Sequence, residues 1–126
     1  MEQLQQTQYV GSPHWENRQA SRMIVLTGTN FYDYDLKAFG KDRILFGRDP
    51  DRCDIVIPMS TISGVHGKIK FANGKTYVGD VGSTNGTYLF RGEIYEWMKP
   101  RKYYQKESGD WILRIDAKSH VSNQSA

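Results

Sequence analysis

Residues 46–87 of this chain have the sequence FGRDPDRCDIVIPMSTISGVHGKIKFANGKTYVGDVGSTNGT. Three polar clusters divide this stretch: Gly47-Arg48 opens it, Ser63-Gly64-Val65-His66 lies in the middle, and Gly82-Ser83-Thr84-Asn85-Gly86-Thr87 closes it. Each cluster lies beside a short apolar run, which is the pattern of a polar loop next to a β-strand. We therefore expect three loops, carried on strands, that meet at one site.

The residue types in the three clusters suit phosphate. Arg48 offers a planar fork that binds two oxygens at once. The hydroxyls of Ser63 and Thr84, the carboxamide of Asn85 and backbone N–H groups freed by glycine can bind the remaining oxygens. None of these groups performs covalent chemistry here, so the clusters predict an anion-binding site.

Strands are predicted on both sides of the clusters. Apolar runs and period-two alternation bounded by turn residues place them at 22–28, 30–36, 43–47, 54–57, 65–71, 75–81, 87–90 and 111–115, with two more within 93–106. Asn73-Gly74 is a strong hairpin signal between two of them. Alternation along 65–71 predicts two faces, one with Val65, Ile69 and Phe71 and the other with His66, Lys68 and Lys70.

Length and composition point to one all-β domain. The chain has 126 residues, enough for a single core, and its eight Tyr, five Phe and three Trp favour strands while its twelve Gly favour turns. The net charge of +3 and pI of about 9.0 suit a phosphorylated or acidic partner. Charge alone gives no ground for expecting nucleic acid.

The two ends differ in composition from the middle. Residues 1–20 are rich in Gln and predict a flexible arm, residues 21–117 the folded domain, and residues 118–126 a polar tail or linker. A lone cysteine, Cys53, cannot form an internal disulfide and indicates a reducing compartment. Without an apolar leader or membrane-spanning run, we expect a cytoplasmic segment that does not insert into membranes.

The order Gly-Arg, Ser-x-x-His and Ser-Thr-Asn-Gly-Thr resembles the forkhead-associated domain family, with the likeness extending over roughly Arg22 to Asp116. The resemblance implies a β-sandwich of two twisted, mainly antiparallel sheets with binding loops at one end. It also implies a non-catalytic adaptor that binds phosphothreonine peptides and recruits partners phosphorylated by a Ser/Thr kinase in signal transduction. No cofactor is expected.

The resemblance implies a role for each site residue. Thr84 is expected to help hold the phosphate, Asn85 to hydrogen-bond the peptide backbone, and His66 to hold Ser63 in place. Thr61 and Gly64 fall where many members carry Arg, Lys or Asn that touch the phosphate or the peptide, so both join the expected binding residues. Gly47 and Gly86 are expected to support the site.

The same residues allow other functions. His66 could be a metal ligand or a catalytic base for Ser63. A zinc site needs several Cys, His or carboxylate ligands that converge, and a catalytic triad needs an orienting acid; neither has a spacing signature here, and His14 and His120 lie in the expected tails. Because Thr61 has a short side chain and Gly64 has none, the main alternative is a phosphate-independent interaction module on the same fold. A further hypothesis is that Thr7, once phosphorylated, binds the chain's own site.

Overall fold

The computed structural model describes residues 22–106 and 109–116. The expected arm at 1–20, the expected tail at 118–126 and the candidate Thr7 lie outside this part. The described residues form ten strands and one short 3-10 helix. In chain order these are β1 (Arg22–Thr27), β2 (Asn30–Asp35), η2 (Leu36–Phe39), β3 (Arg43–Gly47), β4 (Ile55–Val56), β5 (Gly67–Ala72), β6 (Lys75–Asp80), β7 (Tyr88–Arg91), β8 (Ile94–Trp97), β9 (Tyr103–Lys106) and β10 (Trp111–Arg114).

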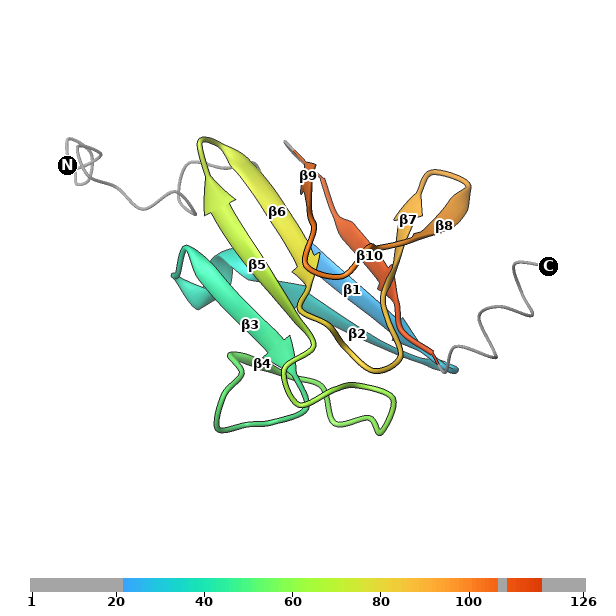
Figure 1. The fold of residues 1–126 in the computed structure, drawn as a ribbon. Helices are drawn as coiled ribbons and strands as arrows, with labels where there is room; N and C mark the ends of the chain where they lie inside the picture. Colours follow the sequence, from blue (N-terminus) through green and yellow to red (C-terminus); the bar gives the residue numbers. More distant parts are fainter. Residues whose placement is uncertain (1–21, 107–108, 117–126) are drawn as a thin grey trace.

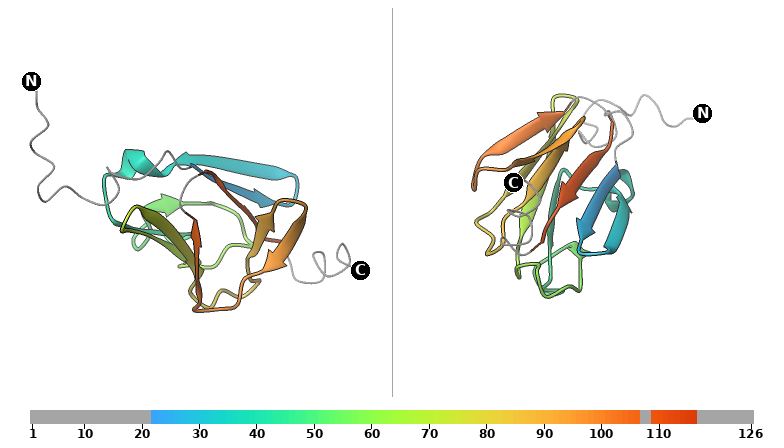
Figure 2. Two further views of the ribbon diagram at one scale, coloured as in Figure 1. Left: turned by 90° about the horizontal axis from the view of Figure 1, so that it is seen from above. Right: turned by 90° about the vertical axis from the view of Figure 1, so that its right-hand side faces the viewer.

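The strands form two five-stranded sheets, ordered β2-β1-β10-β7-β8 and β4-β3-β5-β6-β9. Neighbouring strands pair antiparallel except β1 with β10 and β3 with β4, which pair parallel. The sheets face each other as two layers (Figures 1 and 2). The predicted β-sandwich of two mainly antiparallel sheets is confirmed. No helix among the described residues has the length and apolar character to cross a membrane.

The core lies between the sheets and follows the alternation of the strands. In β1 every second side chain is buried, Met23 and Val25 among them, and β3 buries Ile44 and Phe46 in the same way. Trp111 on β10 is also buried. Each fully buried aliphatic or aromatic side chain contributes about 1.5–3 kcal/mol to folding. The two apolar inner faces therefore hold the sheets together and leave the connecting loops at the surface.

The predicted hairpin at Asn73-Gly74 is confirmed. These residues join β5 to β6 with φ angles of 55° and 76°, both in the left-handed region that a two-residue turn between twisted strands requires. Full antiparallel pairing from Gly67 opposite Asp80 to Ala72 opposite Lys75 follows from this turn. The turn thereby brings Asp80, at the end of β6, beside the start of β5.

One predicted strand was wrong at its first residues. The alternation assigned to 65–71 begins only at Gly67, where β5 starts, and His66 is fully buried, unlike Lys68 and Lys70, whose face it was expected to share. Val65, expected on the face of Ile69 and Phe71, is partly exposed while those two are buried. The two residues belong to the loop before β5, where backbone direction is set by hydrogen bonds to other loops instead of by the pleat.

Three connections lie together at one end of the sandwich. They are the loop from β3 to β4, the loop from β4 to β5, and the connection from β6 to β7, which gather at the lower end of the molecule in Figure 1. They carry the Gly-Arg, Ser-x-x-His and Ser-Thr-Asn-Gly-Thr clusters respectively. The expectation that the binding loops lie at one end is confirmed.

Candidate functional site

Backbone hydrogen bonds bring the first two clusters together. The N–H of Arg48 donates to the carbonyl of Ser63 at 2.9 Å, and the N–H of Asp49 donates to the carbonyl of Gly64 at 3.0 Å. The third cluster joins them because the N–H of Thr84 donates to the Ser63 hydroxyl at 3.0 Å. Arg48, Ser63 and Thr84, separated by up to 36 positions in the chain, therefore lie side by side on one rim.

Arg48 and Arg52 differ in what their guanidinium groups do. Arg48 is exposed, and its side chain makes no ion pair with any residue that the structure describes. Arg52 is paired with the Asp49 carboxylate at 2.6 Å, and it lies over Gly64, where an added Cβ would come within 2.6 Å of its guanidinium. Of these two guanidinium groups, that of Arg48 is the one left to bind an external anion.

The Ser63 hydroxyl is oriented by the loop around it. It accepts a hydrogen bond from the backbone of Thr84, and because a hydroxyl has one proton to donate and two lone pairs, its own O–H proton stays available to an anion. The backbone N–H of Ser63 donates to Nδ1 of His66 at 3.0 Å. Both neighbours fix Ser63 in place without using its donor.

His66 is fully buried beneath this rim. Because Nδ1 accepts from Ser63, the ring proton lies on Nε2, which donates to the Thr87 hydroxyl at 3.0 Å and approaches the carbonyl of Gly86 at 3.3 Å. Burial lowers the pKa of His66 from its ordinary 6.5, and the nearby Asp80 and the Gly86 carbonyl oppose this only in part. The imidazole is therefore neutral at physiological pH and ties the second loop to the third.

Asp80 is a site residue that the sequence patterns did not single out. Its buried carboxylate accepts hydrogen bonds from the hydroxyls of Ser83 and Thr87 and from the N–H groups of Gly82 and Ser83. Burial alone would raise the pKa of Asp80, but these hydrogen bonds outweigh it and lower the pKa. Asp80 therefore fixes the shape of the third loop, and the signal in the sequence is an acid two residues before a Gly-Ser pair.

The proximity of His66 and Asp80 does not form a catalytic pair for Ser63. The imidazole has no exposed surface, and its Nδ1 faces the Ser63 backbone amide instead of the hydroxyl. A general base must reach the proton that it removes. Both ring nitrogens are engaged in hydrogen bonds that hold the loops.

Thr61 and Asn85 meet each other across the rim. The Asn85 amide Nδ2 donates to the backbone carbonyl of Thr61 at 2.8 Å. The Thr61 hydroxyl is 2.7 Å from the Thr27 hydroxyl at the end of β1, so it is held by that residue. The Thr61 side chain is therefore directed to the end of β1, and the Thr61 carbonyl positions Asn85.

Glycines allow the loops to approach closely. A Cβ on Gly47 would lie 2.3 Å from the Gly64 carbonyl oxygen, a contact that no real side chain tolerates. Gly86 has a left-handed φ of 83°, and a Cβ there would meet the indole of Trp97 at 2.9 Å. Gly47 and Gly86 thus lie where only glycine lets the chain pass.

Stability is expected to fall as the pH drops below about 6.5. Because the pKa of His66 is lower in the folded state than its ordinary 6.5, the unfolded chain binds the proton first, and acid favours unfolding until the folded pKa is passed. The lowered pKa of Asp80 keeps its contribution intact until the pH falls below its ordinary 3.8. Thermal midpoints measured between pH 7.5 and 4.5 should therefore decline because of His66.

The matched control is His66→Gln, which should be less stable at pH 7.5 and should lose most of the slope between pH 6.5 and 4.5. If that variant does not fold, imidazole ¹⁵N shifts of the native chain provide the second measurement. They should show a neutral ring protonated at Nε2, and a charged ring at pH 7 would contradict the assignment.

Comparison with known proteins identifies the family. A family model of the FHA domain, the forkhead-associated domain, matches residues 44–113, more than half of the chain. The chain belongs to the FHA domain family, and the resemblance in its motifs is confirmed. Members of this family are protein-interaction modules. A comparison with curated proteins gave no match.

Several solved structures are similar to this chain. The MEK1 FHA domain in complex with a HOP1 phosphothreonine peptide is 25% identical, over 60% of this chain and 72% of that one, with a TM-score of 0.46. An FHA domain of a hypothetical protein from Arabidopsis thaliana is 26% identical, over 61% and 58%, with a TM-score of 0.47. The FHA domain of CT664 from Chlamydia trachomatis is 25% identical, over 62% and 76%, with a TM-score of 0.39.

Proposed function

We propose that this chain is a phosphothreonine-binding adaptor that recruits proteins phosphorylated by a Ser/Thr kinase. The observation that carries the proposal is the rim on which Arg48, Ser63 and Thr84 lie side by side, linked by the hydrogen bonds of Ser63. Membership of a family with a member solved in complex with a phosphothreonine peptide supports it.

In this proposal each group at the rim has its own task. The Arg48 guanidinium binds two phosphate oxygens through parallel, charge-assisted hydrogen bonds, and the Ser63 hydroxyl donates to another. Thr84 adds its own hydroxyl, and Gly64, over which the Arg52 guanidinium lies, adds no side chain to the rim. Ser63 and Thr84 are already held by neighbours, so little conformational entropy is lost on binding.

Asn85 and Thr61 act together on the peptide that carries the phosphate. With its Nδ2 on the Thr61 carbonyl, Asn85 can use its carboxamide oxygen as an acceptor for a peptide N–H. Gly47, His66 and Gly86 keep the loops in this arrangement. The same proposal includes an upstream Ser/Thr kinase, a cytoplasmic location and a role in signal transduction. It also holds that the partner is a phosphorylated protein, not a nucleic acid or a membrane.

A phosphate-independent interaction module on the same fold is the second candidate function. Two observations favour it: the Thr61 hydroxyl is held by Thr27, and Gly64 supplies no side chain to a phosphate. Because Arg52 is paired with Asp49, Arg48 would have to bind the doubly charged phosphate without help from Arg52. This candidate predicts equal affinity for phosphorylated and unphosphorylated peptides.

Calorimetric titration with a phosphothreonine peptide library and its unphosphorylated twin tests the proposal. We expect binding only to the phosphorylated peptides. Phosphoserine peptides should bind about fourfold more weakly, because one buried methyl group is worth about 0.8 kcal/mol. Phosphotyrosine peptides should not bind, because the longer side chain cannot place its phosphate on Arg48. Equal affinity for both libraries would establish the second candidate instead.

A further inference from the structure

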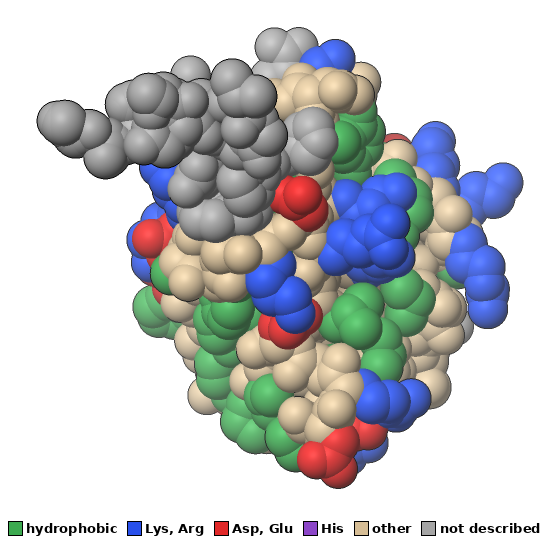
Figure 3. Space-filling model, turned by 90° about the vertical axis from the view of Figure 1, so that its left-hand side faces the viewer, with side chains coloured by type: hydrophobic (Ala, Val, Ile, Leu, Met, Phe, Trp, Pro, Cys, Tyr) green, Lys and Arg blue, Asp and Glu red, His purple; other side chains and the backbone are tan. Residues whose placement is uncertain are grey.

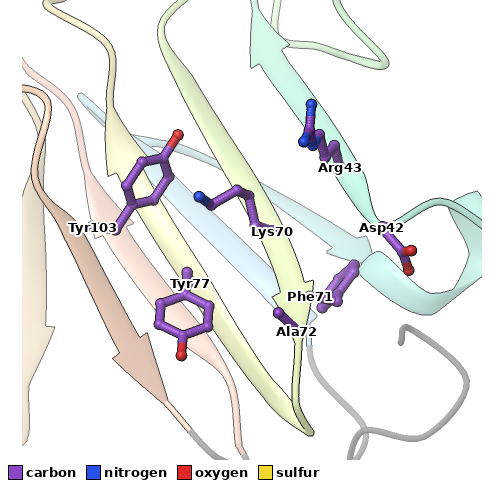
Figure 4. Close-up of a pocket in the computed structure, with 7 residues that line it drawn as sticks. All are labelled: Asp42, Arg43, Lys70, Phe71, Ala72, Tyr77 and Tyr103. Carbon is purple, nitrogen blue, oxygen red and sulfur yellow. The ribbon is translucent and has the colours of Figure 1, made fainter. Parts of the chain in front are cut away.

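A pocket of about 500 Å³ lies on the outer face of the sheet β4-β3-β5-β6-β9, away from the core. It is lined by Asp42, Arg43, Lys70, Phe71, Ala72, Tyr77 and Tyr103, whose arrangement Figure 4 shows. A smaller hollow of about 180 Å³ adjoins it and is lined by Gly79, Asp80, Val81, Arg101 and Tyr103. Tyr103 lines both hollows, and we call the two together the lateral groove.

Two cations lie directly opposite each other in the lateral groove. Arg43 of β3 pairs in register with Lys70 of β5, an arrangement of like charges that destabilises a sheet unless an anion screens it. The Lys70 ammonium lies over the ring of Tyr103, 4.0 Å from its centre, and Figure 4 shows the side chain directed toward that ring. Viewed from the side of β3 and β5, Lys and Arg side chains lie beside hydrophobic and acidic ones (Figure 3).

Arg101 connects the lateral groove to the phosphate rim. Its backbone adopts a left-handed φ of 66°, which is uncommon for a residue with a side chain. Its N–H donates to the carbonyl of Asp80 at 2.7 Å, and its guanidinium lies 3.0 Å from where a Cβ of Gly82 would be. Gly82 begins the loop that carries Thr84, so the groove runs from this loop along the sheet toward Arg43.

The chemistry of the groove favours an acidic peptide over a nucleic acid. Single-stranded nucleic acids bind by stacking successive bases on open aromatic rings. Of the aromatic residues that line the groove, Phe71 is buried and Tyr103 is already covered by Lys70, which leaves Tyr77 for stacking. Carboxylates, in contrast, need only Arg43, Lys70 and Arg101, while the tyrosines provide apolar contact. Asp42 is the acidic residue that also lines the larger pocket.

We propose that the lateral groove binds an Asp- and Glu-rich segment of the same partner that carries the phosphothreonine. This inference rests on the proposed function and adds the class of partner. Arg43 and Arg48 are five residues apart along β3 and its end, about 16 Å in an extended chain. The acidic segment therefore begins about five residues from the phosphothreonine.

Two matched peptides test this inference with the full chain. Each peptide carries one phosphothreonine; the first has four glutamates starting five residues from it, and the second has four glutamines at the same positions. One such pair has the run before the phosphothreonine, and a second pair has the run after it. Ion pairs with Arg43, Lys70 and Arg101, each worth up to about 1 kcal/mol near the surface, should make the glutamate peptide of one pair bind about tenfold more tightly than its glutamine twin at low salt. Lys70→Glu should remove this gain, and Arg43→Glu should do the same.

The matched control is Lys37→Glu, an exposed lysine of η2, which contacts β1 of the other sheet. It should retain the tenfold gain. Unphosphorylated versions of the two peptides separate this inference from the proposed function: a glutamate preference that persists without phosphate and disappears in Lys70→Glu supports the groove alone. Equal binding of the glutamate and glutamine peptides would overturn the inference. So would a single-stranded RNA oligonucleotide that binds more tightly than the acidic peptide and is lost in Lys70→Glu.

Discussion

Replacing Arg48 with alanine is expected to weaken phosphothreonine-peptide binding by about 100-fold or more. Two hydrogen bonds to a charged group are lost, each worth about 1.5–3 kcal/mol, and every 1.4 kcal/mol is a factor of ten in affinity. The fold should be unaffected, because the side chain is exposed and the hydrogen bond from its backbone N–H to Ser63 stays in place. Calorimetric titration and a thermal melt measure the two effects separately.

Two further variants make the result specific to the guanidinium. Arg48→Lys should recover part of the affinity, because it keeps the charge but loses the bidentate geometry. Arg22→Ala, which removes an exposed arginine paired with Asp33 in the other sheet, should bind like the native chain. If Arg48→Ala binds within threefold of the native chain while its melt is unchanged, the phosphate-independent function is the correct one.

The sequence was sufficient to predict the rim because its clusters are short and carry their own geometry. Gly47-Arg48 ends a strand, Asn73-Gly74 sets a turn by its left-handed backbone, and the alternation from Gly67 onward fixes which side chains of β5 enter the core. Each of these features depends on residues close together in the chain. Local patterns therefore predicted the strands and the end of the sandwich at which the loops meet.

What the sequence did not predict depends on contacts between distant residues. His66 was expected on the same face as Lys68 and Lys70 because a period of two was continued through a loop, where its burial is set by Thr87 and Gly86. Asp80 fell within the strand predicted at 75–81, with no sign that it organises the third loop. The engagement of the Thr61 hydroxyl by Thr27, 34 positions away, has no local signal at all.

The lateral groove shows the same division. Lys70 was expected to point outward from β5, and it does. Tyr103 lies in a stretch where aromatic and basic residues mix without a clear period, so its pairing with Gly79 and its contact with Lys70 could not be predicted. A binding surface made by four strands requires their order in the sheet, which only the folded chain provides.

Gly47→Ala is expected to lower the free energy of unfolding by about 3 kcal/mol, at the upper end of the range for overpacked positions. The new methyl group would lie 2.3 Å from the carbonyl oxygen of Gly64 and 2.9 Å from the Cys53 sulfur. The backbone of one loop must therefore move, and the hydrogen bonds from Arg48 and Asp49 to the second loop are strained with it. For a domain of this size the thermal midpoint should drop by more than about 10 °C.

Gly64→Ala is the control that separates backbone contact from the mere addition of a methyl group. Its Cβ would meet only the end of the Arg52 side chain at 2.6 Å, and that side chain is 61% exposed and can move away. Neither glycine has a left-handed φ, so conformational strain does not distinguish them. Gly64→Ala should therefore melt within a few degrees of the native chain, because each kcal/mol of stability lost lowers the thermal midpoint by about 4–8 °C. Equal midpoints for the two variants would show that the first and second loops are not in the close contact on which the rim depends.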